Sequence, residues 1–231
     1  MKKLLVAVAA TVTVGIASAQ TADQIIAAHI DSIGGKANID KIKNVVIAGA
    51  FTVQGMPIEV TITKVQNKLS RKDISAMGMK GYDLATDTSG WVFMPIQGMA
   101  TPVQKSADDV KDEKAELDIA GPLNDYAAKG LKAEFSGKDT IDGKAAYKIK
   151  LATASGKEKT YFIDATSYLI VREVDKIEFN GQKMDVSVDY GDYRIVDGVK
   201  FPYSISQQFG TINISSVKVN GKIEDKLYRN Q

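Results

Sequence analysis

The stretch MDVSVDY, residues 184–190, alternates apolar and polar side chains and decides the fold class of this chain. Met184, Val186, Val188 and Tyr190 fall on one side of the alternation, and aspartate and serine fall on the other. Successive side chains of a β-strand point to opposite faces of a sheet, so a period of two predicts a strand with one buried face. A sheet of such strands is apolar on one face only and must curl over something to bury that face.

Similar alternation occupies most of the chain after Asn44. Residues 45–53 and 145–151 repeat it, and strands recur about every 10 to 14 residues, a spacing typical of antiparallel sheets. Between the strands lie dipeptides that favour two-residue hairpins, because both turn positions need a positive φ. These are Asp142-Gly143, Asn180-Gly181, Asp197-Gly198 and Asn220-Gly221. The order predicts a meander in which each strand pairs with its neighbour in sequence.

A helix is predicted before the first strand. Thr21 and Gln24 have the spacing of a capping box, which marks a helix start. The inner stripe of this helix ends at Gly34-Gly35 and consists of Ile26, His29, Ile30 and Ile33. His29 lies on the buried side, and we interpret it as a hydrogen-bonded core residue, because the partners that a catalytic base needs are not evident near it.

Residues 105–130 interrupt the strands. Their first part is rich in Asp, Glu and Lys and has few apolar residues, so it predicts a solvated helix with a narrow inner stripe. Gly121-Pro122 breaks this helix. A second short helix is predicted after the break from the spacing of Leu123, Tyr126, Ala127 and Leu131. No Pro- or Ser-rich linker divides the chain, so we expect one domain.

The residue types restrict the chemistry that is available. There is no cysteine, and His29 is the only histidine. Cysteine nucleophiles, disulfides, structural zinc and iron–sulfur clusters therefore lack their ligands, and a Ser-His-Asp triad would have to use His29. Pairs of nearby aspartates have neither catalytic nor calcium-loop spacing. We predict no catalytic residues, no metal ligands and no cofactor, which indicates a protein that is not an enzyme.

The N-terminus predicts export. Lys2 and Lys3 precede an apolar run that ends in Ala17-Ser18-Ala19, the pattern of a signal peptide, so we expect cleavage after residue 19 and a mature domain of residues 20–231 in the periplasm. No cysteine follows the apolar run, so the protein is not expected to be lipidated itself. Those two lysines account for the formal net charge of +2, and the mature chain is neutral. Neutrality argues against nucleic-acid binding.

One segment concentrates unusual residues. Met is flexible and polarizable and recurs on surfaces that accept ligands of variable shape, although it also fills gaps in protein cores. Two prolines lie in the same segment, just before the charged helix, an arrangement that could make a lid over an apolar cavity. The candidate ligand-binding residues are Met77, Met79, Trp91, Phe93, Met94 and Met99.

Several stretches, in this order and spacing, resemble the LolA/LolB-like superfamily of periplasmic outer-membrane lipoprotein-sorting proteins. They are ADQIIAAHIDSIGG at 22–35, KAAYKIKL at 144–151, TYFIDATSYLIVR at 160–172, DYRIVDGVKFPYSI at 192–205 and INISSVKVNGKIEDKLY at 212–228. The resemblance implies an α+β, mainly β fold: an antiparallel sheet of about 11 strands curled into an incomplete β-barrel. An N-terminal helix and a helical insertion would cover its concave face, an apolar cavity for acyl chains.

Two functions remain open at this point. The first is a monomeric, non-enzymatic carrier of a lipid, a lipoprotein acyl chain or another apolar molecule, with transient contacts to outer-membrane or envelope proteins. The alternative is an envelope interaction module whose sheet is filled by its own side chains and which binds a protein, for example through an edge strand. An enzyme that uses carboxylates or His29 is the least favoured reading.

Overall fold

The computed structural model describes residues 21–153, 157–179, 182–208 and 210–230. The predicted signal peptide and the Asn180-Gly181 turn lie outside them. All strands form one open antiparallel sheet in the order β6-β5-β4-β3-β2-β1-β13-β12-β11-β10-β9-β8-β7. The strands are β1 (Asn44–Val53), β2 (Met56–Val65), β3 (Leu69–Ala76), β4 (Met79–Thr86), β5 (Gly90–Phe93), β6 (Val103–Gln104), β7 (Lys132–Ile141), β8 (Lys144–Ala152), β9 (Glu158–Asp164), β10 (Ile170–Phe179), β11 (Gln182–Val196), β12 (Val199–Gln207) and β13 (Gly210–Val219).

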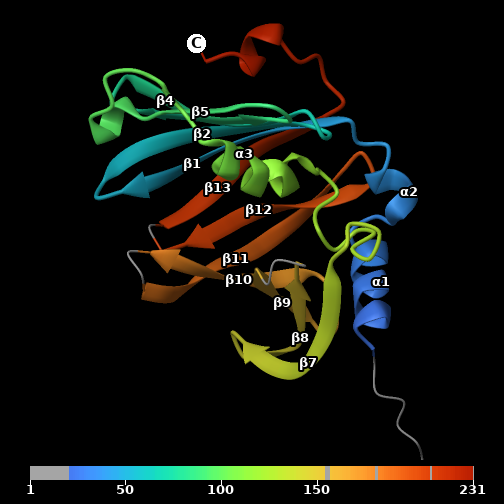
Figure 1. The fold of residues 1–231 in the computed structure, drawn as a ribbon. Helices are drawn as coiled ribbons and strands as arrows, with labels where there is room; N and C mark the ends of the chain where they lie inside the picture. Colours follow the sequence, from blue (N-terminus) through green and yellow to red (C-terminus); the bar gives the residue numbers. More distant parts are fainter. Residues whose placement is uncertain (1–20, 154–156, 180–181, 209, 231) are drawn as a thin grey trace, which may run out of the picture.

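The sheet consists of two meanders joined by its first and last strands. We call β1–β6 the N-terminal arm and β7–β13 the C-terminal arm. Val45 of β1 lies opposite Val219 of β13, and antiparallel pairing continues to Ala50 and Asn213. The sheet curls, so that one face is concave and helices lie on that side (Figure 1). This confirms a mainly β fold with an open, curled antiparallel sheet.

The described residues form thirteen strands rather than about 11. The short strands explain part of the difference: β5 has four residues and β6 has two, too few to show a clear alternation. Asp142-Gly143 and Asp197-Gly198 form the predicted hairpins, with positive φ at all four residues. Asn220-Gly221 does not, because in the described chain only a short 3-10 helix, η3 (Asp225–Tyr228), follows β13.

The insertion between the arms is less helical than predicted. It contains α3 (Ala107–Glu113), capped by Ser106 and Asp109, and a 3-10 turn, η2 (Lys114–Leu117). The second helix, predicted over residues 123–131, is absent, and that segment consists of turns. Asp125 has a φ of 53°, which interrupts any helix, and its carboxylate bonds to Lys36. The remaining 3-10 turn, η1 (Pro95–Gln97), precedes β6.

Helix α1 (Ala22–Ser32) packs on the concave face of the C-terminal arm. The predicted capping box of Thr21 is present. The buried cluster under the helix includes Ile25, Ile26, Tyr147, Ile149, Tyr161 and Ile163. Gly34 follows the helix, and a Cβ there would lie 2.2 Å from the carbonyl oxygen of Gly198, so only glycine lets the chain pass the β11–β12 turn. The short helix α2 (Lys36–Ile39) leads into β1.

His29 is a core residue, as predicted. It is buried in α1, and its Nδ1 lies 2.8 Å from the carbonyl oxygen of Tyr168. Burial lowers the pKa of His29, against the opposing effect of this backbone hydrogen bond. The imidazole therefore serves to tie α1 to the β9–β10 turn.

The N-terminal arm has its core on the outer face. Leu69, Tyr82 and Leu84 are buried there and pack with Trp91, Phe93 and Leu227. Leu227 belongs to η3, which lies above β4 and β5 in Figure 1. The guanidinium of Arg71 donates to the carbonyl oxygens of Leu227 and Arg229, at 3.3 and 3.0 Å. The C-terminal segment thus covers the outer side of this arm.

Candidate functional site

The concave face of the N-terminal arm lies beneath the insertion. Residues directly opposite each other on antiparallel strands share a face, and Ile62, Lys72 and Asp83 are opposite one another across β2, β3 and β4. The same face carries Ile74 and Gly81, which also lie opposite each other. We call these five residues the inner face of the N-terminal arm. The face is mixed, with charged side chains between apolar ones.

Ion pairs hold the insertion over this face. The ammonium of Lys105, only 8% exposed in its side chain, lies 2.7 Å from carboxylate oxygens of both Asp83 and Glu113. Burial lowers the pKa of Lys105, but its hydrogen bonds to those carboxylates outweigh burial and raise the pKa above its usual value. Lys105 therefore stays charged and ties α3 to β4.

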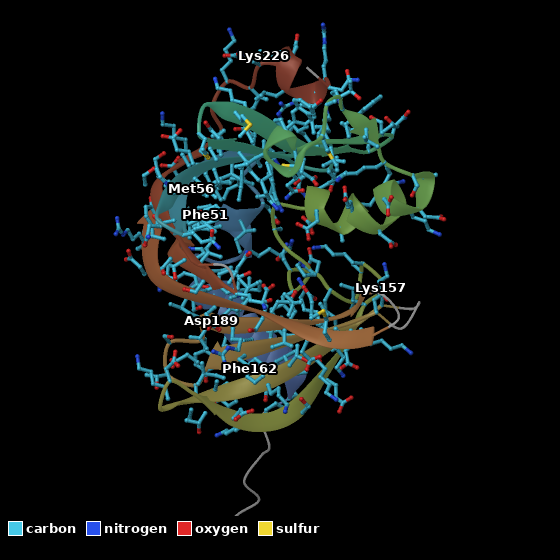
Figure 2. All side chains as sticks on the ribbon, turned by 90° about the vertical axis from the view of Figure 1, so that its left-hand side faces the viewer. Phe51, Met56, Lys157, Phe162, Asp189 and Lys226 are labelled. Carbon is cyan, nitrogen blue, oxygen red and sulfur yellow. The ribbon has the colours of Figure 1, made fainter. Side chains whose placement is uncertain are left out.

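Further pairs join the insertion to both arms. Lys64 of β2 lies 3.3 Å from Glu116 of η2, and Lys157, next to β9, lies 2.5 Å from Asp112 of α3. Figure 2 shows the curl of the sheet and the position of Lys157 across the opening from the N-terminal arm. The insertion thus bridges the opening between the arms, and polar contacts attach it on both sides.

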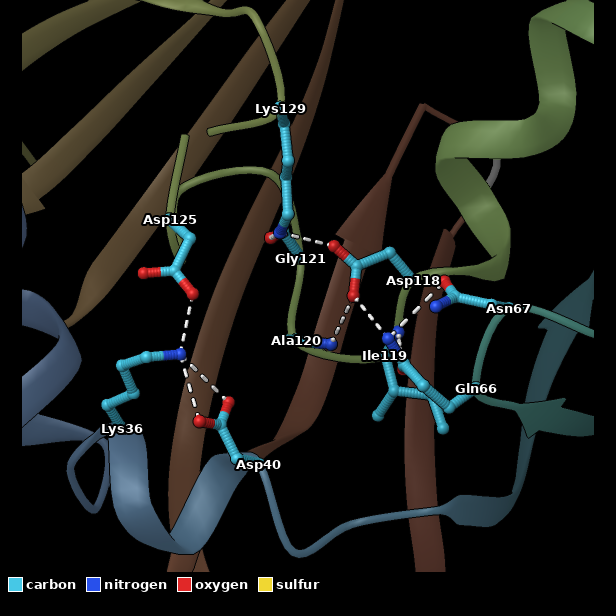
Figure 3. A network of polar contacts seen from close by, with 10 residues as sticks. All are labelled: Lys36, Asp40, Gln66, Asn67, Asp118, Ile119, Ala120, Gly121, Asp125 and Lys129. Atoms are coloured by element: carbon cyan, nitrogen blue, oxygen red, sulfur yellow. Dashed lines mark hydrogen bonds and ion pairs between the residues drawn. The ribbon is translucent and has the colours of Figure 1, made fainter. Parts of the chain in front are cut away.

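The segment after η2 is fixed by a second polar network (Figure 3). Gln66 donates to Asp118 at 2.9 Å and accepts from the backbone N–H of Ile119 at 2.8 Å. Lys36 of α2 lies 2.5 Å from Asp125 and 2.9 Å from Asp40. This network places Ile119 against the apolar residues of β12 and β13 on the concave side.

A third polar group lies on the concave side where the two arms meet the insertion. Lys159 of β9 lies 3.2 Å from both Glu173 and Asp175 of β10. Tyr161 is directly opposite Glu173, and Lys159 is opposite Asp175. Glu116 of η2 belongs to the same group, because, despite the opposing effect of desolvation, the positive charges of Lys64, Lys159 and Lys72 lower the pKa of its carboxyl. We define the inner polar cluster as Lys64, Lys72, Glu116, Lys159, Tyr161, Glu173, Asp175 and Tyr190.

Burial governs the ionisation of this cluster. It raises the pKa of the Glu173 carboxyl despite the opposing charge of Lys159. It also raises the pKa of the Tyr161 and Tyr190 hydroxyls far above the ordinary value, and the negative charge of Glu173 adds to the shift. Both phenols therefore remain neutral. This cluster was not predicted from the sequence. Its signal was that Lys159 lies two residues from the buried Tyr161 and therefore on the same face of β9, opposite Asp175 of β10.

The structure does not bring the six predicted binding residues to one face. Trp91 and Phe93 pack into the outer core with Tyr82. The Met94 sulfur lies next to Gly81, on the inner face, and it would be 3.2 Å from a Cβ at that glycine. Met99 folds back on Met94, whose backbone N–H donates to its sulfur at 3.3 Å. Met94 and Met99 thus stay together on the inner side.

The other two methionines lie at the rim of the N-terminal arm. Met77 is in the β3–β4 turn with a φ of 53° and is 72% exposed. Met79 begins β4 and is also exposed, as is Ile96 of η1. We call Met77, Met79 and Ile96 the apolar rim.

Two of the hollows on the described surface lie elsewhere. One, of about 530 Å³, lies between α1 and residues 123–128 and is lined by Ile26, Ile30 and Leu123 among others. The other, of about 830 Å³, lies beside the β7–β8 and β9–β10 turns. None of the six predicted residues lines either hollow. Within the described residues no group of three or more His, Asp or Glu is placed to hold a metal ion, and no helix has the length and apolarity to cross a bilayer.

Comparison with known proteins identifies the fold. No family model matches the sequence, and no curated protein matches it either. A LolA superfamily protein of Nitrosomonas europaea superposes with a TM-score of 0.56 over 91% of this chain and 98% of that one, at 15% identity. The chain has a LolA-like fold. An outer membrane lipoprotein-sorting protein domain of Vibrio parahaemolyticus superposes with a TM-score of 0.55 over 88% of this chain and 98% of that one, at 9% sequence identity. A DUF1329 family protein of Desulfovibrio piger superposes with a TM-score of 0.56 over 90% of this chain and 97% of that one, at 10% sequence identity.

The LolA-like fold confirms the resemblance seen in the sequence. It covers nearly the whole described chain, as the order of the five quoted stretches predicted. At these identities the likeness concerns the path of the chain and assigns no residue a role. The function must therefore be argued from the inner face, the insertion and the inner polar cluster of this protein.

Proposed function

We propose that this protein is a non-enzymatic carrier that holds the apolar part of a lipid or lipidated molecule between the inner face of the N-terminal arm and the insertion. The supporting observation is the way the insertion is attached. Lys105, Lys64 and Lys157 hold it by ion pairs at its edges. The pairs of Lys64 and Lys157 have exposed partners and contribute little stability each, so lifting the insertion to admit a ligand costs mainly the buried ion pairs of Lys105 and the packing of Val110 and Leu117.

The carrier is exported in this proposal. The signal peptide at residues 1–19 directs the chain to the periplasm, and residues 20–231 act there as one domain. The LolA-like fold supports this, since one superposed structure is described as a lipoprotein-sorting domain.

Native mass spectrometry on protein purified from a periplasm without detergent tests the proposal. We expect a bound acyl species that solvent extraction releases, and uptake of an apolar fluorescent probe by the extracted protein. Met94→Asp should weaken probe binding about tenfold or more, because it places a carboxylate beside Gly81 on the inner face. Met77→Asp is the matched control, since Met77 is exposed at a turn, and it should bind the probe normally.

A bare protein mass together with no probe uptake would refute the carrier. The second candidate, an interaction module, is favoured by the apolar rim, where three large apolar side chains are exposed together. In that case Met77→Asp, and not Met94→Asp, should abolish capture of a specific envelope protein by the purified chain.

A further inference from the structure

Tyr161 has a hydroxyl group without a structural use. The residue is 1% exposed, and among the described residues its hydroxyl has no hydrogen-bond partner. A buried hydroxyl without a partner is unfavourable, and phenylalanine would fill the same space without that cost. Its neighbour across the strands is charged, because Tyr161 lies directly opposite Glu173, which pairs with Lys159. A partner from outside the chain would satisfy the hydroxyl.

The position of Tyr161 connects this group with the proposed carrier site. Its ring packs in the cluster under α1, at the end of the concave face that α1 covers. From Tyr161 the inner polar cluster extends to the N-terminal arm, because Glu116 of η2 forms an ion pair with Lys64 of β2. A ligand whose tail lies along the inner face of the N-terminal arm would therefore bring its other end to the cluster when η2 lifts.

The charges in the cluster determine which kind of polar group on a ligand could bind there. Three lysines, Lys64, Lys72 and Lys159, balance three carboxylates, those of Glu116, Glu173 and Asp175. Lys159 already contacts two carboxylates, so it has little to offer an anion, and an anion would approach Glu173 and Asp175. A cation would meet the lysines in the same way. A neutral group that donates and accepts hydrogen bonds avoids both costs.

We propose that the inner polar cluster is a subsite for the uncharged, hydroxyl-bearing polar end of an amphiphile, with the Tyr161 hydroxyl as its hydrogen-bonding partner. This inference rests on the proposed carrier function and adds a ligand class to it. The Tyr190 hydroxyl interacts with the Glu173 carboxyl beside the subsite.

Competition with a bound apolar fluorescent probe tests the ligand class. The competitors share the same kind of long, singly unsaturated hydrocarbon tail and differ at the polar end: 1-monooleoylglycerol is neutral, oleate is anionic and oleylamine is cationic. We expect monooleoylglycerol to displace the probe at a concentration at least about fivefold lower than either charged competitor. Equal displacement by all three would overturn the subsite and leave the carrier standing. Failure of the wild-type protein to bind any probe would overturn the carrier and the subsite together.

Two phenylalanine substitutions test the residue. Tyr82 offers a matched control, because it is also buried with an unpartnered hydroxyl but lies in the outer core. Tyr161→Phe should lose the preference for monooleoylglycerol, a fall of about five- to tenfold in its affinity, with probe binding unchanged. Tyr82→Phe should keep that preference. Thermal unfolding should show both variants folded, and a Tyr161→Phe protein with the wild-type preference would refute the assignment.

Discussion

The two arms of the sheet bury opposite faces. In the C-terminal arm the core lies on the concave side, where α1 covers Ile149, Tyr161 and Ile163. In the N-terminal arm the cluster of Leu69, Tyr82 and Leu84 lies on the outer side, under η3. The concave side of that arm is left to the insertion and its ion pairs.

This difference shows where the fold can change without unfolding. Removing α1 from the C-terminal arm would expose a large apolar cluster. Lifting α3 and η2 from the N-terminal arm would hydrate ion pairs and expose only two buried apolar side chains of the insertion, Val110 and Leu117, and the core beneath η3 would stay intact. The three experiments below either sharpen this contrast or remove it.

The largest expected effect comes from truncating the same residue type in each arm. Ile149→Ala, at a fully buried position under α1, should lower the free energy of unfolding by about 2 to 5 kcal/mol. Ile74→Ala, on the half-buried inner face of the N-terminal arm, should lower it by about 1 kcal/mol or less. Urea denaturation measures both values. Equal losses would mean that the inner face is as tightly packed as the core under α1.

A smaller effect is expected from Lys105→Met. The substitution leaves Asp83 and Glu113 without their shared cation, and the cost should be about 1 to 3 kcal/mol. Amide hydrogen exchange should accelerate in residues 107–117 and remain slow in α1. Lys157→Met is the control, because both partners of its ion pair are well exposed, and it should change stability by less than about 0.5 kcal/mol. Acceleration spread over α1 as well would contradict an insertion that opens separately.

The smallest effect concerns pH and α1. Burial lowers the pKa of His29 in the folded protein, so the folded state disfavours the charged imidazole. The contribution of the neutral imidazole to stability is complete above the pKa of about 6.5 that His29 has in the unfolded chain. It is lost as the pH falls toward the lower pKa that His29 has in the folded protein. Stability should therefore drop by roughly 1 kcal/mol or less between pH 7.5 and 5. His29→Asn, which can still donate to the Tyr168 carbonyl, should flatten that part of the profile measured by urea denaturation at each pH.

Much of the fold could be predicted from local patterns. Alternation marked the strands, the capping box of Thr21 marked α1, and Asp142-Gly143 and Asp197-Gly198 marked hairpins. Met77-Gly78 forms an equally tight turn without Asn or Asp, so composition did not reveal it. The second insertion helix was predicted wrongly because Asp125 adopts a positive φ and bonds to Lys36, a contact 89 residues away in sequence.

The candidate site was harder to predict. A period of two assigns side chains to faces, but it does not say which face is concave. Trp91 and Phe93 were grouped with Met94, yet the strand residues point to the outer core, whereas Met94 lies by Gly81 on the inner side. The inner polar cluster depends on strand register and on η2 crossing between the arms, and neither is encoded in a local stretch of residues.

The pairing of β1 with β13 has a consequence for how the protein reaches its native state. Each arm is built from hairpins between neighbouring strands, which close short loops and form early. The junction between them must bring Val45 to Val219, across most of the chain, and closing so long a loop is slow. The two arms should therefore appear first as separate folding units, and their union at the centre of the sheet should limit the rate at which the finished protein forms.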